Sequence, residues 1–313
     1  MQNYCGVDVS KDWLDCFVPP SHFERYENNP EGIGKLAAAV MAQGAPLVVM
    51  EASGGIERVP YYLLWESGVA CAIVNARSVR DFAKAMGKLE KTDRIDASVI
   101  AHYAATKEIK PMPPPSKDQQ RLSALSARMR QVVSDLTVQK QRLHTAHEDV
   151  ARPGLLEIIA VLKRQSKSLS AEIAALISAD PLWAALDAEL RTVKGVADRT
   201  VATLMADLPE LGLLSNKAIA KLAGLAPLAD DSGKRQGTRR TKGGRTSVRC
   251  ILFLVGDIAS KYDPSLKAFR QRLVDKGKKK MVIRIALAHK LLIRLNAKAR
   301  DIRRAYALME AAA

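Results

Sequence analysis

Four acidic residues stand at positions where an ionised side chain needs compensation. Asp8 lies in the middle of one short apolar segment, and Glu51 ends another. Burying a carboxylate in such a segment is costly unless a cation or hydrogen-bond donors offset the lost hydration. Asp93 and Asp96 follow three positions apart, which places both on one face of a helix.

Phosphoryl transfer is the chemistry that these acids favour. Mg²⁺ prefers oxygen ligands, and a pair of such ions stabilises both the attacking and the leaving oxygen. The sequence therefore predicts a Mg²⁺ site with the ligands Asp8, Glu51, Asp93 and Asp96. For the last two an alternative stays open, in which they only favour the N-terminal dipole of a helix capped by Thr92. Four other acids are expected on the solvated surface, namely Asp12, Asp15, Glu57 and Glu90.

Ser232, in the second half of the chain, offers a nucleophile. Serine attacks poorly on its own and needs a base or metal, together with cations that stabilise the phosphorane. The stretch from Gly233 to Arg249 holds seven Lys or Arg and no acid. A phosphoserine link would conserve bond energy for rejoining DNA, whereas the alternative is a flexible basic loop that only grips a backbone. The expected nucleic-acid-binding residues are Lys234, Arg235, Arg239, Arg240, Lys242, Arg245 and Arg249.

The positive charge is confined to the second part of the chain. The formal charge is +16, yet residues 1–118 hold 13 Lys and Arg against 15 Asp and Glu, while residues 119–313 hold 36 against 18. Such a surface predicts a polyanionic partner, with an inert basic surface as the alternative. A further basic segment, residues 267–304, fits DNA and RNA equally well.

Cysteine usage and hydropathy indicate a cytoplasmic protein. The four cysteines stand singly, three of them in apolar runs, which predicts buried thiols. His144 and His147 have no further ligand at zinc spacing. No apolar run is long enough to cross a bilayer, and residues 1–9 lack the regions of a secretory signal. We expect no membrane contact and a cytoplasmic, nucleoid-associated protein of bacterial type.

The elements that must position these residues begin with a sheet. Apolar and alternating segments predict three strands, at residues 4–9, 14–18 and 22–26. Then follow a helix at 30–43, a strand at 46–52, a helix at 56–67 and a strand at 69–74. Antiparallel strands followed by strands that alternate with helices predict an α/β domain of RNase H-like fold.

Beyond this domain the chain reads as helical. The proline-rich segment Lys110–Pro115 predicts a stiff linker. Helical periodicity then predicts long antiparallel helices or a coiled coil, with packing or dimerisation as the use of its apolar stripe. Only Ala229–Arg245 interrupts the helices after residue 180. The predicted domains are residues 1–115, 116–179 and 180–313.

Val193–Thr200 predicts a turn between two helices. It resembles a helix-hairpin-helix, in which glycine lets backbone amides approach a phosphate. Ala197 replaces the second glycine usual in that motif. An ordinary helix-turn-helix packing unit is the alternative that stays open.

Four segments in order resemble the DEDD transposases of the insertion-sequence 110 family and the related Piv-type DNA invertases. They are Gly6–Lys11, Met50–Gly55, Lys91–Ala97, and Gly224–Pro227 with Ser232-Gly233. The resemblance runs nearly end to end, and the four motifs are specific together although none is specific alone. Two departures are the compact length of the chain and the acids Asp230-Asp231 just before the serine.

The resemblance implies a RuvC-like N-terminal domain, a coiled-coil linker and a mainly helical C-terminal transposase domain. It implies that Asp8, Glu51, Asp93 and Asp96 bind Mg²⁺ and that Ser232 is the nucleophile. It also implies a homotetramer, a dimer of dimers, in which the carboxylates of one protomer meet the serine of another. In characterised members a noncoding bridge RNA pairs with double-stranded donor and target DNA.

The sequence therefore predicts a site-specific DNA recombinase or transposase of a bacterial insertion sequence. It would cut and rejoin DNA through a serine-linked phosphodiester with Mg²⁺ at the four carboxylates. The first alternative is a RuvC-like, metal-dependent junction nuclease without a covalent intermediate. The second is a nucleic-acid-binding protein that has lost catalysis.

Overall fold

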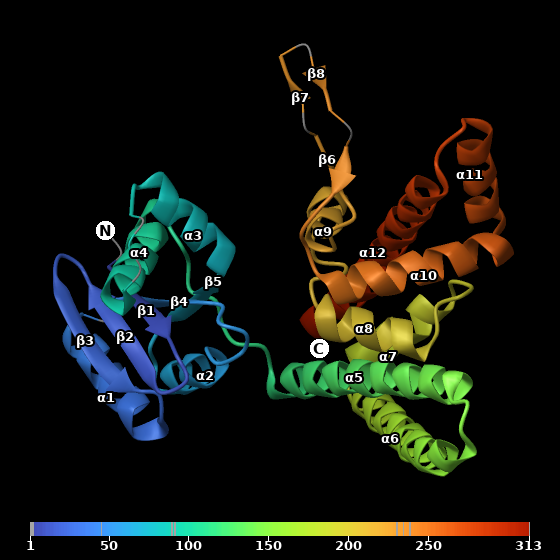
Figure 1. The fold of residues 1–313 in the computed structure, drawn as a ribbon. Coiled ribbons are helices and arrows are strands. Elements are labelled where there is room, and N and C mark those ends of the chain that lie inside the picture. The colour runs from blue at the N-terminus through green and yellow to red at the C-terminus, as the bar shows by residue number, and fades with distance from the viewer. Residues whose placement is uncertain are drawn as a thin grey trace. The chain divides into compact units, whose positions relative to one another are not determined.

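The chain divides into two compact units, Met1–Pro115 and Ser116–Ala313, and the proline-rich segment ends the first. The computed structural model describes residues 3–44, 46–88, 90, 92–229, 231–233, 235–237 and 239–312. Unit 1 is built on a sheet, and unit 2 is mainly helical (Figure 1).

A mixed five-stranded sheet with the order β3-β2-β1-β4-β5 forms the centre of unit 1. Its strands are β1 (Tyr4–Val9), β2 (Trp13–Val18), β3 (His22–Glu27), β4 (Leu47–Glu51) and β5 (Cys71–Val74). The first three pair antiparallel, while β4 is parallel to both β1 and β5. This mixed sheet, followed by a mostly helical remainder, is compatible with the predicted RNase H-like N-terminal domain.

Helices cover both faces of the sheet. They are α1 (Pro30–Ala42), α2 (Arg58–Glu66), α3 (Ala76–Ala85) and α4 (Asp93–Thr106). Side chains alternate along a strand, so Val7 and Val48 pack towards α1 and α2, whereas Tyr4 and Val49 pack towards α3 and α4. Cys5, Cys16 and Cys71 are buried as predicted, while Cys250 of unit 2 is exposed. Burial raises the pKa of the Cys71 thiol to about 12.

Helix α4 lies directly on strand β1, and a glycine makes the contact possible. A Cβ at Gly6 would stand 2.1 Å from the Ala97 carbonyl oxygen and 2.5 Å from the Ala101 amide nitrogen. No other residue fits this approach without moving the helix. The strand that carries Asp8 and the helix that carries Asp96 are therefore in backbone contact.

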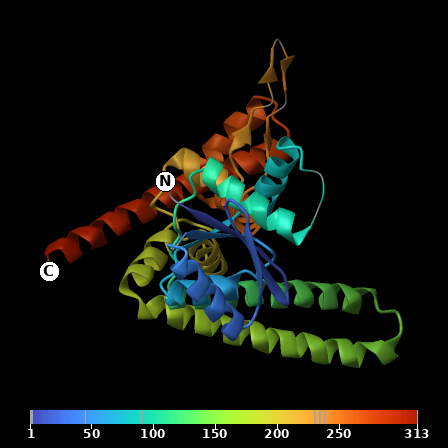
Figure 2. The same ribbon diagram turned by 90° about the vertical axis from the view of Figure 1, so that its left-hand side faces the viewer.

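Unit 2 begins with two long helices that run side by side, α5 (Lys117–Thr145) and α6 (Arg152–Ala179), joined through the short 3₁₀ segment Asp149–Ala151 (Figure 2). The apolar stripe predicted on α5 packs in the unit's core, where Leu122 and Met129 are buried. The Gln119 side-chain amide also donates to the carbonyl of Met205, at 3.0 Å. At least part of the stripe therefore serves packing within the unit.

Six further helices complete unit 2 within the residues that the structure describes. They are α7 (Pro181–Arg191), α8 (Asp198–Asp207), α9 (Asn216–Leu222), α10 (Thr246–Tyr262), α11 (Pro264–Asp275) and α12 (Lys280–Ala312). The segment that resembles a helix-hairpin-helix forms the turn between α7 and α8. Its residues Val193 and Val196 belong to the core. This burial supports the packing interpretation, while a phosphate contact at Gly195 stays a prediction.

Four short strands occupy the predicted interruption of the helices. Pro227–Leu228 (β6) pairs with Arg240–Thr241 (β9), and Asp231–Ser232 (β7) pairs with Arg235–Gln236 (β8). Together they form a basic hairpin, residues 227–241, whose β7 and β8 extend away from the helices of unit 2 (Figure 1). Ser232 stands near its end.

No single helix within the described ranges is long and apolar enough to cross a membrane. One bent pair, Asp149–Ala179 with Pro181–Arg191, passes that test only by its combined length and composition.

Candidate active site

Three of the four predicted carboxylates line one small pocket in unit 1. Asp8 comes from β1, Glu51 from the end of β4 and Asp96 from the first turn of α4, and they share a cavity of about 180 Å³. Asp8 lies four residues after Tyr4, and Glu51 lies two residues after Val49, both of which pack towards α3 and α4. Because side chains alternate along a strand, this even spacing directs Asp8 and Glu51 to the same face. All three side chains belong to half-buried residues. We name this cavity the acid pocket.

Basic side chains balance the acids of this pocket. Arg80 and Lys84 of α3, with Lys88 just beyond it, line the acid pocket, as does Glu90. Glu90 is exposed, as predicted. Lys88 Nζ donates to Ser98 Oγ at 3.4 Å. These cations reduce the mutual repulsion of clustered carboxylates, and no sequence motif predicted their place in the pocket.

The fourth carboxylate, Asp93, does not line the acid pocket. Its side chain is 61% exposed, and its Oδ2 accepts a hydrogen bond from Arg25 Nη2 at 2.6 Å. The same guanidinium donates to Asp15, with Nε to Oδ1 at 2.7 Å. Hydrogen bonds to Asp15, and secondarily to Asp93, raise the pKa of Arg25. Arg25 thus joins a strand acid to an acid of α4.

The prediction that Asp15 is solvated is wrong, because its residue is only 2% exposed. Asp15 points to the face of the sheet that α4 covers, and the register of β2 with β3 sets Arg25 directly beside it. A buried carboxylate with a bidentate guanidinium partner retains compensation for its lost water. Arg25 was missed because its role depends on this cross-strand register, although alternation along the two predicted strands could have revealed the pair.

The prediction for Glu57 is also wrong, since this residue is 6% exposed. Its Oε2 accepts hydrogen bonds from the amides of Ser53, at 3.0 Å, and Gly55, at 2.8 Å. Glu57 therefore closes the turn between β4 and α2. Backbone donors compensate the burial that the residue type alone disfavours.

The acid pocket offers the oxygen donors that a hard divalent cation prefers, but its side chains are not close enough together to bind one. Oxygen donors from three elements face one cavity, as Mg²⁺ requires. In the part of the chain that the structure describes, however, no three His, Cys, Asp or Glu side chains lie close enough to hold a metal ion. The side chains would have to rotate inwards, and Asp93 would have to leave Arg25. Asp93 and Asp96 also occupy the first turn of α4, where Thr92 accepts from the Ile95 amide, so the helix-dipole alternative stays open for both.

Ser232 is exposed in strand β7, on the basic hairpin of unit 2. The neighbouring carboxylate of Asp231 accepts hydrogen bonds from the Gly237 amide at 3.1 Å and from Arg239 at 3.4 Å. One of the two acids noted before the serine is thus balanced locally and braces the hairpin. Asp230 and Lys234 lie outside the described residues, and for Arg235 the structure describes the backbone in β8 alone.

The other predicted nucleic-acid-binding residues divide into two groups. Arg239, Arg240 and Lys242 are exposed. Arg245 is instead paired with Glu210, with Nη2 to Oε1 at 2.6 Å, and Arg249 donates to the carbonyl of Gly243. The last two arginines fasten the hairpin to the helices.

Two glycines close the base of the hairpin. A Cβ at Gly224 would stand 2.2 Å from the Gly243 carbonyl oxygen, and one at Gly244 would stand 2.2 Å from the Gly224 amide nitrogen. Both adopt the left-handed region, with φ values of 69° and 70°. The motif Gly224–Pro227 therefore works as an anchor where two backbones meet.

Two family models match the chain along most of its length. One, described as a transposase of the DEDD insertion-sequence 110 type, matches residues 5–150. The other, described as a transposase of the IS116/IS110/IS902 family, matches residues 187–271. The first segment contains the acid pocket with Asp93, and the second contains the basic hairpin with Ser232.

Curated relatives agree with these matches. The chain is 28% identical over 317 residues to the pilin gene-inverting proteins of Moraxella lacunata and Moraxella bovis, covering 93% of this chain and 94% of each relative. It is also 28% identical over 155 residues to an uncharacterised 43.6 kDa protein of insertion element IS110 from Streptomyces coelicolor, which covers 49% of this chain and 37% of that protein.

An acid pocket on a mixed sheet and a basic, mostly helical second unit, together with these matches, define an enzyme that recombines DNA, a transposase or recombinase. The chain belongs to the IS110 family of transposases, and it is similar to the pilin gene-inverting recombinases of Moraxella. Membership implies a DNA substrate and the use of a divalent metal.

Proposed function

We propose that this protein is a site-specific recombinase that cuts and rejoins DNA through a covalent bond to Ser232. The observation that carries the proposal is the pairing of two chemistries in one chain: three carboxylates on one pocket in unit 1, and an exposed serine on a basic hairpin in unit 2. Neither alone is sufficient for strand exchange. The Moraxella relatives are named for gene inversion, a reaction that breaks and rejoins DNA.

In the proposed reaction, Ser232 Oγ attacks a backbone phosphorus as its proton leaves for a base. An ester bond between phosphorus and serine forms, and the bond from phosphorus to one deoxyribose oxygen breaks. The released sugar oxygen takes up a proton. A hydroxyl from another DNA end reverses these steps, so the strands are rejoined without loss of bond energy.

The acid pocket would hold the metal in this proposal, with Asp8, Glu51 and Asp96 as ligands and Asp93 joining after it leaves Arg25. Bound Mg²⁺ would supply charge stabilisation for the attacking and leaving oxygens. The chain's own contribution is positional, because contact between Gly6 and α4 keeps Asp8 and Asp96 on one pocket. Arg80, Lys84 and Lys88 offset the negative charge before a cation arrives.

On the hairpin, exposed Arg239 and Arg240 would neutralise the phosphate that Ser232 attacks. The ion pair between Asp231 and Arg239 holds the Arg239 side chain close to β7, the strand that carries Ser232. Cations held near a pentacoordinate phosphorus stabilise its developing charge.

The proposal includes the domain roles and assembly that the resemblance implies. Residues 1–115 would form a RuvC-like catalytic domain, 116–179 a coiled-coil linker and 180–313 the transposase domain, in a homotetramer that works on donor and target DNA at the nucleoid. A bridge RNA would select the sites. The 14 Lys and Arg between residues 267 and 304 support binding of a nucleic acid without distinguishing RNA from DNA.

Trapping on a nicked suicide DNA substrate tests the covalent step. Wild type and the control Ser178→Ala, which alters another exposed serine of unit 2, are expected to give a protein–DNA adduct. Ser232→Ala is expected to give none. An undiminished adduct in Ser232→Ala contradicts the serine mechanism. Cleaved ends without any adduct in the wild type would favour the metal-dependent nuclease.

Native pull-down followed by RNA sequencing tests the guide. One noncoding RNA species enriched with the wild-type protein is the expected result. Recombination by protein freed of RNA would remove the guide from the proposal and leave a DNA invertase.

A further inference from the structure

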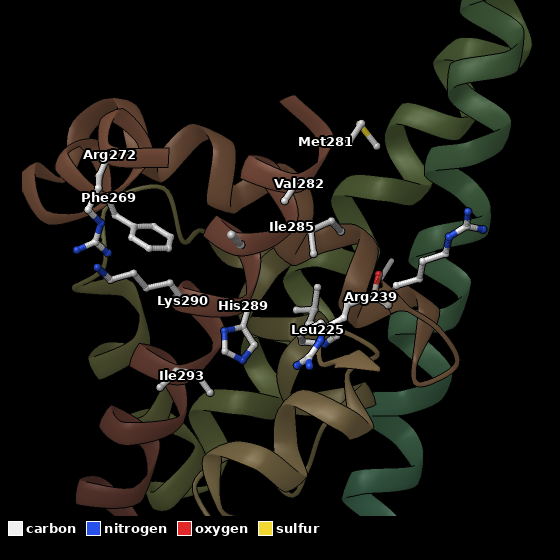
Figure 3. Close-up of a pocket in the computed structure, with 14 residues that line it drawn as sticks. Leu225, Arg239, Phe269, Arg272, Met281, Val282, Ile285, His289, Lys290 and Ile293 are labelled. Carbon is white, nitrogen blue, oxygen red and sulfur yellow. The ribbon is translucent and has the colours of Figure 1, made fainter. Parts of the chain in front are cut away.

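A cavity of about 840 Å³ lies in unit 2, and the proposed reaction uses only two of its lining residues, Arg239 and Arg240. It is bounded by the base of the basic hairpin, by α11 and by the first half of α12 (Figure 3). Binding sites for small molecules typically measure about 300–1,000 Å³. The cavity is thus of the size that accepts a molecule rather than a few waters.

Apolar side chains form its walls. Ile285 and Ile293 of α12 line the cavity, and Phe269 of α11 stands at one side (Figure 3). Met281 and Val282, at the start of α12, are 61% and 52% exposed. Burial lowers the pKa of His289 and so favours its neutral ring, which extends the uncharged wall. Apolar walls with a few polar groups at the edge are typical of sites that bind a small molecule or group.

Cations ring the mouth. Arg239 lies across the cavity from Phe269 and Lys290 (Figure 3), with Arg240 beside it in β9. On the far side, Lys290 Nζ and the Arg272 guanidinium stand 4.4 and 5.2 Å from the centre of the Phe269 ring. None of the described residues that line the cavity is acidic. The rim therefore selects an anion, and the walls select an apolar or aromatic group.

We propose that this cavity binds an unpaired nucleotide of single-stranded DNA, with its base against the apolar walls and its phosphates on the arginine and lysine rim. The inference rests on the proposed function, because pairing of the proposed bridge RNA with one strand of a DNA duplex leaves the other strand unpaired. Bases gain from stacking on aromatic rings and from contact with apolar side chains, while cations track the backbone.

Other occupants match the cavity less well. Duplex DNA keeps its bases stacked inside and presents phosphates, which would leave Met281, Val282 and Phe269 uncovered. A second copy of unit 1 offers little charge, since residues 1–118 hold 15 acidic against 13 basic side chains. An acidic peptide from another protein matches the rim but supplies no base-like ring beside Phe269.

A matched pair of substitutions on α12 tests the proposal. Met281→Glu and Met309→Glu each place a new carboxylate on an exposed methionine of the same helix, and only Met281 lines the cavity. The probes are a fluorescent single-stranded DNA of mixed sequence and a duplex of equal length, bound to the full chain. We expect Met281→Glu to weaken single-strand binding by about tenfold, with duplex binding within about twofold, and Met309→Glu to change neither.

Equal losses for both DNA forms, or no loss for either, would overturn the proposal. Displacement of the single strand by poly-glutamate at equal concentration would assign the cavity to an acidic peptide instead. As a second measurement, a 5-iodouracil oligonucleotide should photocross-link to a peptide that contains Phe269, and cross-links confined to other peptides would contradict the site. Ser232→Ala should keep full single-strand affinity, so failure of the covalent mechanism and failure of this site are distinguishable.

Discussion

The acid pocket and the basic hairpin hold their reactive groups in opposite ways. In unit 1, Asp8 and Asp96 stand on a strand and a helix whose backbones touch at Gly6. In unit 2, Ser232 stands on two-residue strands whose described side chains are mostly exposed. Packing fixes the backbones that carry these two acids before substrate arrives. The serine is fixed only at the base of its hairpin, so DNA itself must complete its placement.

The largest test of this contrast removes one acid. Asp8→Asn keeps the shape of the pocket but removes a metal ligand, and we expect strand cleavage to fall by at least about a hundredfold. DNA affinity should stay within about twofold, because the exposed cations of the hairpin belong to unit 2. Cleavage of labelled DNA and fluorescence anisotropy measure the two effects. The control is Asp12→Asn, an exposed acid next to the same strand, and a comparable loss there would contradict a specific role for the pocket.

The second test disturbs the contact that positions the acids. Gly6→Ala forces a methyl group against the backbone of α4, and we expect the free energy of unfolding of unit 1 to fall by about 2–4 kcal/mol. Gly34→Ala in α1 is the control, since nothing lies within 4 Å of its added Cβ, and it should raise stability by about 0.5–1 kcal/mol. Hydrogen exchange resolved to unit 1 measures both. Equal protection in Gly6→Ala and wild type would show that α4 is not held as rigidly as this contrast requires.

A third test asks whether the helical frame behind the hairpin is rigid. Burial acts to raise the pKa of Asp263, but hydrogen bonds from the Ser265 hydroxyl and the Leu266 amide, with the Arg294 guanidinium, outweigh it and lower this pKa to about 2. A carboxyl whose pKa is lowered in the folded state stabilises the fold at pH values above its pKa in the unfolded chain, about 3.9. This stabilisation is lost as the pH falls towards 2.

We therefore expect Asp263→Asn to lower the stability of unit 2 at pH 7 by about 1–2 kcal/mol, after allowance for the partly exposed Arg294. Urea unfolding at a series of pH values measures this effect. The difference in stability between variant and wild type should shrink as the pH falls from about 4 to about 2. A difference that stays constant over this range would mean that Asp263 does not anchor α10 and α11 through its charge.

The smallest effect separates the two groups of hairpin arginines. Arg239→Ala should weaken duplex binding a few fold and reduce the slope of log affinity against log salt by about 1, with unchanged stability. Arg245→Ala should instead destabilise unit 2, because Glu210 loses its partner. Salt titrations and thermal unfolding measure these outcomes. A larger affinity loss from Arg245 than from Arg239 would reverse the assignment of anchor and contact.

The sheet was largely predictable because most of its strands are short apolar runs. Such a run indicates a buried strand by itself, without knowledge of the strands that pair with it. The structure places strands and helices at all the segments expected in unit 1, with small shifts at their ends, as for the helix expected at residues 56–67 and observed at Arg58–Glu66. A run of apolar residues carries this information locally. The helical second unit followed from periodicity for the same reason.

Individual charged residues were less predictable, because the environment of a charge depends on distant partners. Asp15 and Glu57 were expected in solvent, yet a cross-strand arginine and two backbone amides compensate their burial. Arg245 and Arg239 look alike in sequence and serve differently in the structure. Three acids share a pocket as the motifs suggested, but the hold of Arg25 on Asp93 depends on the register of β2 with β3 and its contact with α4, which no single motif encodes.

The glycine pair at the base of the hairpin has a consequence for how this element can evolve. Every amino acid except glycine carries a Cβ, and neither Gly224 nor Gly244 has room for one. These two positions should therefore be invariant among active descendants. Exposed hairpin residues such as Arg239 and Arg240 meet no such barrier, so they can change around Ser232 while the attachment of the hairpin stays the same. Selection can thus alter how the hairpin contacts DNA without first rebuilding the fold.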